Sequence, residues 1–228
     1  MLHNLKEIYG SKLAALDGEI GVVKDFYFDD QTWVIRYLVA DTGFRLAGRL
    51  VLLSPHAFGK WDQYEKTLHL KLQQKQIEHS PSLESHRPIS RPFETEYHRY
   101  YGWPDYWEDG ATGKDERERR RLRSGDANHL QSTRAMTGYR LQTADGVLGQ
   151  VSGFLVNDRS WAIRRLIVAT DPGSGGREIQ LAPERITHLS FPEAKIFVDL
   201  TAAELQQTAE NSLVQAGSGN QGGGNPSE

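Results

Sequence analysis

Asp17-Gly18-Glu19-Ile20-Gly21 is the stretch that decides the fold, because it returns 128 positions later (145 − 17 = 128) as Asp145-Gly146-Val147-Leu148-Gly149. From this motif onward the two halves of the chain stay in register without a gap. Residues 10–72 and 138–200 are identical at 19 of 63 positions, and 10 of these identities fall within residues 17–38. Self-similarity at a fixed offset is the mark of a duplicated structural unit. The sequence therefore predicts two copies of one small domain.

Each copy is made of short strand-like segments separated by turn residues. The Asp-Gly pair that opens the motif is a tight-turn dipeptide, and residues 26–33 predict a hairpin whose turn recurs at 157–160. The run 33–40 is rich in β-branched and aromatic residues at strand length. A later strand, 49–53, stops at Pro55, because proline cannot donate to a strand ladder.

The apolar pattern of the second strand also predicts an irregularity. The apolar positions shared by the two copies are 20, 23, 26 and 28, and the odd steps between them break the alternation of a regular strand. A bulge or sharp bend between Gly21 and Asp25 would restore the alternation. Five to six short strands in roughly 70 residues are typical of a small closed barrel. The predicted fold class is all-β, with two small β-barrels from an internal duplication.

The copies and the segments outside them give four divisions. We expect repeat 1 over 1–80, a linker over 81–135, repeat 2 over 136–205, and the end of a helix with a disordered tail over 206–228. The linker has no counterpart in the first copy and combines four prolines, an aromatic cluster and a charge run at 114–123.

The C-terminal residues predict a short helix and then a tail. Thr201-Ala202-Ala203-Glu204 has the spelling of a capping box, which predicts a helix to about Val214. Residues 217–228 are rich in glycine and cannot bury apolar surface, so we expect them to be flexible.

Three of these features resemble the pattern of tandem PRC-barrel domains: Asp-Gly-x-x-Gly, the Trp-x-Ile-Arg-x-Leu strand and the strand that ends at proline. The resemblance covers about 10–80 and 136–205 and extends to Tyr100-Tyr101-Gly102-Trp103-Pro104, which is similar to a segment of bacterial members. The family is named from the cytoplasmic domain of the photosynthetic reaction-centre H subunit and includes the C-terminal domain of a ribosome maturation factor. The resemblance implies a docking or structural module and supplies no catalytic residue.

The composition excludes several functional classes. A net charge of -3 and a sequence pI of about 6.3 argue against a global electrostatic footprint for nucleic acid or anionic lipid. The absence of cysteine excludes disulfides, thiolate metal sites and cysteine nucleophiles, and we expect a cytoplasmic protein. The sequence holds no apolar run of about 18 residues and no secretion-signal pattern at residues 1–7, so no transmembrane segment is expected.

No catalytic, cofactor or metal site is predicted. The eight histidines include no pair at i, i+4, and without cysteine a zinc site would need scattered ligands. The carboxylates of Asp29 and Asp30 are assigned to a hairpin turn, and those of Asp105, Glu108 and Asp109 to a polar linker. The glycine-rich residues 173–176 lie between two strands and are interpreted as a loop.

Two residue pairs shared by the copies allow a functional interpretation, Trp33 with Trp161 and Arg36 with Arg164. A duplicated arginine could bind an anion twice. A shared tryptophan is more often a core residue, and an arginine three positions on more often covers it or pairs with a carboxylate. We therefore assign both pairs a structural role.

The strands of the first copy look apolar on both faces. Where the second copy has Gln150, Arg165, Glu178 and Gln180, the first has Val22, Tyr37, Leu50 and Leu52. A solvated sheet face should avoid such residues, so we expect a cover on this outer wall. The aromatic linker, the other barrel, a second subunit and a partner protein are the candidates. The residues predicted to meet a partner are Tyr100, Tyr101, Trp103, Tyr106, Trp107, Leu50 and Leu52.

The predicted function is that of a non-enzymatic docking or scaffold module that binds a protein partner or a second copy of itself. A photosynthetic or electron-transport complex at a membrane and the stress response are the settings considered. One alternative is an RNA- or ribosome-associated factor, because aromatic residues precede six basic residues at 114–123. The other alternative is a binder of a small ligand between the barrels. No cofactor is expected.

Overall fold

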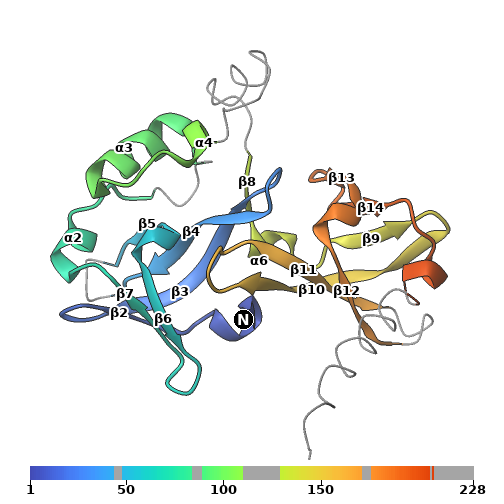
Figure 1. Ribbon diagram of the computed structural model, residues 1–228, viewed down its shortest axis with the longest axis horizontal. Coiled ribbons are helices and arrows are strands. Elements are labelled where there is room, and N and C mark those ends of the chain that lie inside the picture. The colour runs from blue at the N-terminus through green and yellow to red at the C-terminus, as the bar shows by residue number, and fades with distance from the viewer. Residues whose placement is uncertain (44–47, 84–88, 110–128, 171–175, 206, 208–228) are drawn as a thin grey trace, which may run out of the picture. The chain divides into compact units, whose positions relative to one another are not determined.

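β-strands make up most of the regular structure in this computed structural model, which describes residues 1–43, 48–83, 89–109, 129–170, 176–205 and 207 (Figure 1). The chain divides into two compact units. Unit 1 consists of Met1–Ala135 and Asn157–Ala162, and unit 2 consists of Met136–Val156 and Ile163–Glu228. The described part of segment 81–135, which we expected to be a linker, is thus counted with unit 1. The predicted charge run at 114–123 lies outside the described residues.

Unit 1 contains eight strands among its described residues. They are β1 (Leu2–Asn4), β2 (Lys12–Ala15), β3 (Gly18–Asp29), β4 (Val34–Asp41), β5 (Leu50–Leu53), β6 (Phe58–Asp62), β7 (Thr67–Leu70) and β8 (Leu130–Ser132). Its helices are α1 (Leu5–Ile8), the 3-10 turn η2 (Pro55–Ala57), α2 (Gln74–Glu78), α3 (Arg91–Tyr101) and α4 (Tyr106–Asp109); α6 (Thr133–Met136) lies at the division between the units.

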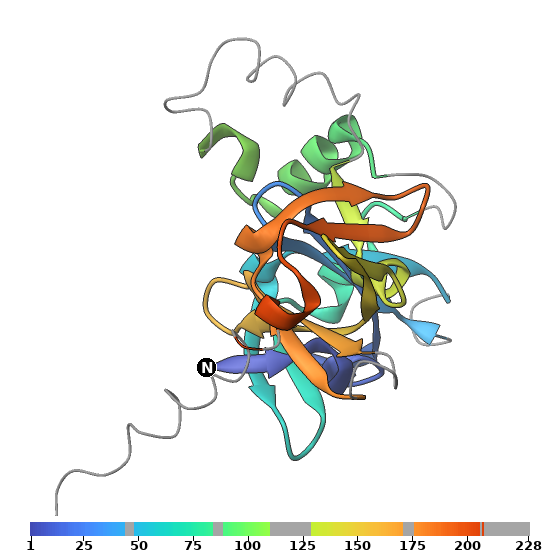
Figure 2. The ribbon, with the colours of Figure 1, turned by 90° about the vertical axis from the view of Figure 1, so that its right-hand side faces the viewer.

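Fewer named elements occur among the described residues of unit 2. They are β9 (Arg140–Thr143), β10 (Gly146–Asn157), β11 (Ile163–Thr170), β12 (Glu178–Leu181), the 3-10 turn η4 (Pro183–Arg185), β13 (Ile186–Ser190) and β14 (Lys195–Val198). These strands can be followed in yellow to red in Figure 2.

The strand order is the same in both units. The sheet of unit 1 runs β5-β4-β3-β2-β7-β6, with β8 added to β3, and the sheet of unit 2 runs β12-β11-β10-β9-β14-β13. One pair is parallel in each path, β2 with β7 and β9 with β14, and the other pairs are antiparallel. The twelve-residue strands β3 and β10 hold the centre of each path.

The predicted bulge is confirmed. The register of β3 on β4 shifts between Val23 and Asp25, and that of β10 on β11 shifts between Val151 and Gly153. The extra residue returns the apolar side chains to one face, so that Val23 and Phe26 are both buried in the core of unit 1.

The second glycine of the repeated motif allows two strands to approach closely. A Cβ atom on Gly21 would lie 2.0 Å from the carbonyl oxygen of Asp41, and one on Gly149 would lie 2.1 Å from that of Ala169. No side chain fits at either position, because such contacts are far inside van der Waals distance. The second glycine of the motif therefore lies where β3 approaches β4 closely and where β10 approaches β11 closely.

The C-terminal capping box is present. The Glu204 carboxylate accepts from the backbone N–H of Thr201 at 2.8 Å, and the backbone N–H of Glu204 donates to the Thr201 hydroxyl at 3.3 Å. Residues 202–205 are helical. Residue 207 is also helical, and the rest of the predicted helix to Val214, with the tail at 217–228, lies outside the described residues.

Candidate functional site

Segment 89–109 holds a helix that the sequence analysis did not predict. α3 carries Pro92 in its first turn and ends at Gly102, whose φ of 68° is the left-handed conformation typical of a helix end. Figure 1 shows this helix in green on the side of unit 1 that carries β4 and β5. Its buried residues recur at helical spacing and are Arg91, Glu94, Tyr97 and His98.

The outer wall of β4 and β5 is covered by this segment. Tyr37, Val39 and Leu52 are buried there together with Tyr97 of α3. The Tyr97 hydroxyl donates to the carbonyl of Leu52, and its ring meets Tyr37 edge to face with centroids 6.3 Å apart. Of the four candidate covers, the aromatic segment of the same unit is the one the structure places on this wall.

The seven residues predicted to meet a partner lie in or around this cluster. Leu52 is buried within it, and Leu50, Tyr101, Trp103 and Tyr106 pack against it as half-buried side chains. Trp107 is also half-buried, with the Arg91 guanidinium 4.4 Å from its ring centroid. Tyr100 is the one exposed member, at 41%, and its hydroxyl donates to the carbonyl of Gln76.

A pocket of about 450 Å³ opens in unit 1 beside the aromatic cluster. Its walls come from β4, η2, β6, α3, α4 and the turn at 158–161. The apolar part of the lining includes Ile35, Phe58 and Trp161, all of them buried. Trp161 meets Phe58 edge to face with centroids 4.6 Å apart. A volume of this size is typical of sites for small molecules.

The turn at 157–161 holds Trp161 against this wall by its backbone conformation. The Asn157 side chain accepts from the backbone N–H groups of Arg159 and Ser160, and Trp161 has a φ of 53°. Asp29 makes the same bonds in the first copy, to Gln31 and Thr32. Asp29 therefore serves a turn, as the sequence predicted.

Positive charge dominates the polar part of the pocket. Arg36, Lys71 and Arg159 line it, against one carboxylate, Asp158. That carboxylate already faces the amino group of Met1 at 2.9 Å, a hydrogen bond that lowers the pKa of Asp158. Within the part of the chain that the structure describes, neither Lys71 nor Arg159 forms an ion pair.

Arg36 differs from Lys71 and Arg159 because it contacts a carboxylate and an aromatic ring. Its guanidinium lies 3.7 Å from the Asp29 carboxylate and 4.0 Å from the centroid of the Tyr106 ring. Its Nε is buried and has no hydrogen-bond partner among the described residues. Of the two structural roles expected for this arginine, covering the tryptophan or pairing with a carboxylate, Arg36 has the second, and the same side chain also reaches the pocket.

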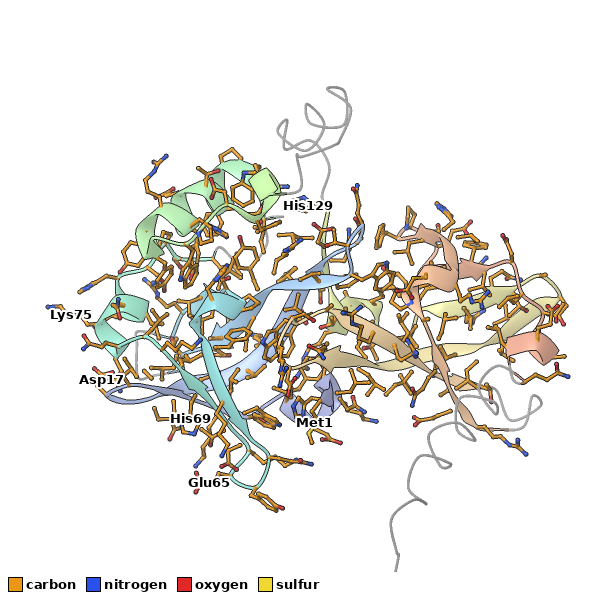
Figure 3. All side chains as sticks on the ribbon, viewed as in Figure 1. Met1, Asp17, Glu65, His69, Lys75 and His129 are labelled. Atoms are coloured by element: carbon orange, nitrogen blue, oxygen red, sulfur yellow. The ribbon has the colours of Figure 1, made fainter. Side chains whose placement is uncertain are left out.

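A buried polar network lies behind His98 and Tyr106, two of the pocket-lining residues. The Glu94 side chain is fully buried, and its Oε1 accepts from the hydroxyls of Tyr37, at 3.0 Å, and Tyr106. Its Oε2 lies 2.9 Å from the Arg91 guanidinium. His129 lies beside α4 in Figure 3 and approaches the Tyr106 hydroxyl at 3.1 Å.

His98 joins this network from the pocket side. Its Nδ1 faces the carbonyl oxygen of Pro104 at 2.8 Å, and its Nε2 lies 2.7 Å from the Tyr37 hydroxyl. Burial lowers the pKa of His98, and burial raises the pKa of Glu94 to about 6. Burial therefore favours the neutral forms of both His98 and Glu94.

Most of these residues were not singled out by the sequence. In the sequence, Tyr37 differs from its counterpart Arg165 only as a less polar residue, and His98 is one of eight histidines that have no i, i+4 partner. Among the described residues, no three histidine or acidic side chains are grouped as a metal site would need. In the described part of the chain, no helix has the length and apolar character to cross a membrane. The side chains of Glu108 and Asp109 lie outside the description.

Comparison with known proteins adds no assignment to this geometry. No family model matches the sequence, and no curated protein matches it either.

Proposed function

We propose that both units are PRC-type barrels and that they arose by duplication. The shared strand order supports this proposal, and so does the backbone at equivalent positions. Left-handed φ values occur at Trp33 and Trp161, and again at Lys66 and Ala194, each pair 128 residues apart (161 − 33 and 194 − 66). Non-glycine residues rarely adopt this conformation, so its recurrence at one offset favours a common origin.

We propose further that the protein is a cytoplasmic, non-enzymatic binding module whose site is the pocket of unit 1. The observation that carries this proposal is the lining. Lys71 and Arg159, which have no ion-pair partner among the described residues, line the same pocket as the buried rings of Phe58 and Trp161. Unpaired positive charge attracts an anion, and a buried apolar wall accepts a flat apolar body. The ligand class is therefore a small carboxylate or phosphate ester on an aromatic or aliphatic body.

Isothermal titration calorimetry with benzoate, phenyl phosphate and benzyl alcohol tests this function. Both anions should bind and the neutral alcohol should not. Lys71→Ala and Arg159→Ala should each weaken binding about tenfold, which corresponds to roughly 1.4 kcal/mol for a lost charged contact. Lys75→Ala is the matched control, because Lys75 is exposed and does not line the pocket. Equal affinity for benzyl alcohol and benzoate would overturn the proposal.

Docking to a protein partner, the role implied by the family resemblance, is the second candidate. The exposure of Tyr100 favours it, since exposed tyrosines are frequent hot spots of protein interfaces. Pull-down from native lysate, with nuclease and salt controls, should recover a partner with the native chain and lose it with Tyr100→Ala. Recovery that disappears after nuclease treatment would support the RNA-associated alternative instead.

A further inference from the structure

The side chains of Glu94, Tyr37 and His98 form a hydrogen-bonded chain, and its contacts determine how many protons it must contain. The Pro104 carbonyl can only accept, so the 2.8 Å contact requires a proton on Nδ1 of His98. The Tyr37 hydroxyl has one proton but two close neighbours, Oε1 of Glu94 at 3.0 Å and Nε2 of His98 at 2.7 Å. It can donate to only one of them.

The contacts of Tyr37 with Glu94 and with His98 can both be hydrogen bonds only if these three side chains share one proton more than those on the Tyr37 hydroxyl and on Nδ1 of His98. If Tyr37 donates to an ionised Glu94, then Nε2 of His98 must carry a proton and donate to Tyr37. If Tyr37 donates to His98, then Glu94 must be protonated and donate to Tyr37. Without that proton, one buried acceptor faces the lone pairs of the Tyr37 oxygen, which is costly because none of the three side chains is more than 1% exposed.

The location of this proton changes the charge at the pocket. His98 lines the pocket, whereas neither Glu94 nor Tyr37 does. A proton on His98 places a positive charge in the pocket wall, and an anion bound beside that wall stabilises this state. Because the bound anion stabilises protonated His98, linkage requires that protonation of His98 in turn strengthens the binding of the anion.

We propose that the pocket of unit 1 binds its anion together with one proton, which the buried Glu94–Tyr37–His98 chain holds against the pocket wall. This inference rests on the proposed function, because it needs the anion to bind there. It assigns Tyr37 the role of a positioning residue that connects Glu94 to His98 without contacting the ligand.

Other charged or titratable groups face the two ends of the chain. Around Glu94 they are Arg91, Tyr106, His129 and Asp29, and around His98 they are Asp105, His56 and Arg91. Burial raises the pKa of Tyr106, so this hydroxyl does not titrate near neutrality. His56 also lines the pocket and is the rival source of pH dependence.

Calorimetric titration of benzoate between about pH 6 and pH 8, in buffers of different ionisation enthalpy, measures the protons taken up. Uptake should approach one proton per ligand at the alkaline end, and affinity should fall by up to about tenfold per pH unit. Tyr37→Phe should remove the uptake and retain binding at the alkaline end. Tyr27→Phe is the matched control, because Tyr27 is the cross-strand neighbour of Tyr37 and does not line the pocket.

The outcomes separate the two proposals. Binding with no proton uptake overturns the inference and leaves the proposed function intact, whereas no binding at any pH overturns both. Uptake that survives Tyr37→Phe and disappears in His56→Asn assigns the proton to His56 and also overturns the inference. If Tyr37→Phe does not fold, nitrogen chemical shifts of His98 in the native chain decide: they should show protonated Nδ1 throughout, and Nε2 should gain a proton when benzoate is added. Unchanged shifts would contradict the proposal.

Discussion

Replacing Tyr97 by alanine tests whether α3 belongs to the core of unit 1. The side chain is fully buried, its ring contacts Tyr37 and Trp103, and its hydroxyl donates to the carbonyl of Leu52. Truncation of a buried aromatic residue costs about 3–5 kcal/mol from lost burial and the cavity left behind. For a domain of this size that corresponds to a fall in Tm of roughly 6–20 °C.

Glu96→Ala is the control for this experiment. Glu96 lies next to Tyr97 on the exposed face of the same helix, so its removal tests helix propensity without packing. We expect a change within about 0.5 kcal/mol. Thermal unfolding followed by near-ultraviolet circular dichroism would report both variants. Equal melting temperatures for Tyr97→Ala and the native chain would refute the packing of α3 on β4 and β5, because a detached helix contributes nothing to that wall.

Three further outcomes follow from the same contacts. Gly21→Ala should destabilise by about 3 kcal/mol in urea unfolding, because its Cβ would meet the Asp41 carbonyl, whereas Gly10→Ala, with open space around it, should cost about 1 kcal/mol; equal losses would contradict the close-approach argument. Trp103→Ala should cost only about 1–2 kcal/mol in the same assay, because that ring is half-buried, and a loss as large as that of Tyr97→Ala would argue for deeper burial. Burial raises the pKa of Glu94 from 4.5 to about 6, so the folded state binds this proton more tightly than the unfolded state. The resulting stability, on the order of 2 kcal/mol, is complete below pH 4.5 and is lost as the pH rises through about 6; Glu94→Gln should flatten this dependence, and an unchanged slope would contradict the assignment.

The strands could be predicted because their signals are local. Asp-Gly turns, β-branched runs and a terminal proline each act over a few residues, and the odd spacing of apolar positions located the bulge between Gly21 and Asp25. The similarity of residues 10–72 to residues 138–200 made each signal visible twice. The expected cover of the outer wall followed from comparing equivalent positions, such as Leu52 and Gln180.

Helix α3 and the pocket of unit 1 could not be predicted, because no local apolar pattern in the sequence indicates either of them. The buried face of α3 carries Arg91, Glu94 and His98, and hydrophobic periodicity does not detect a stripe whose members are polar. Ser90 and Pro92 at its start and Gly102 at its end were the available signals. The pocket brings together Lys71, Tyr106 and Arg159, residues far apart in sequence, and only the fold sets their proximity.

The division of the chain into two units also determines where the polypeptide can be cut without damage to a core. Residues 157–162 are counted with unit 1, and Trp161 contacts Phe26 and Phe58 there. A fragment that ends at residue 135 would lack Trp161 and one wall of the pocket, and it would expose the rings of Phe26 and Phe58 to water. The repeat boundary in the sequence is therefore a poor place for proteolytic or recombinational separation. A chain cut at this boundary would leave unit 1 without Trp161 and therefore with an incomplete core.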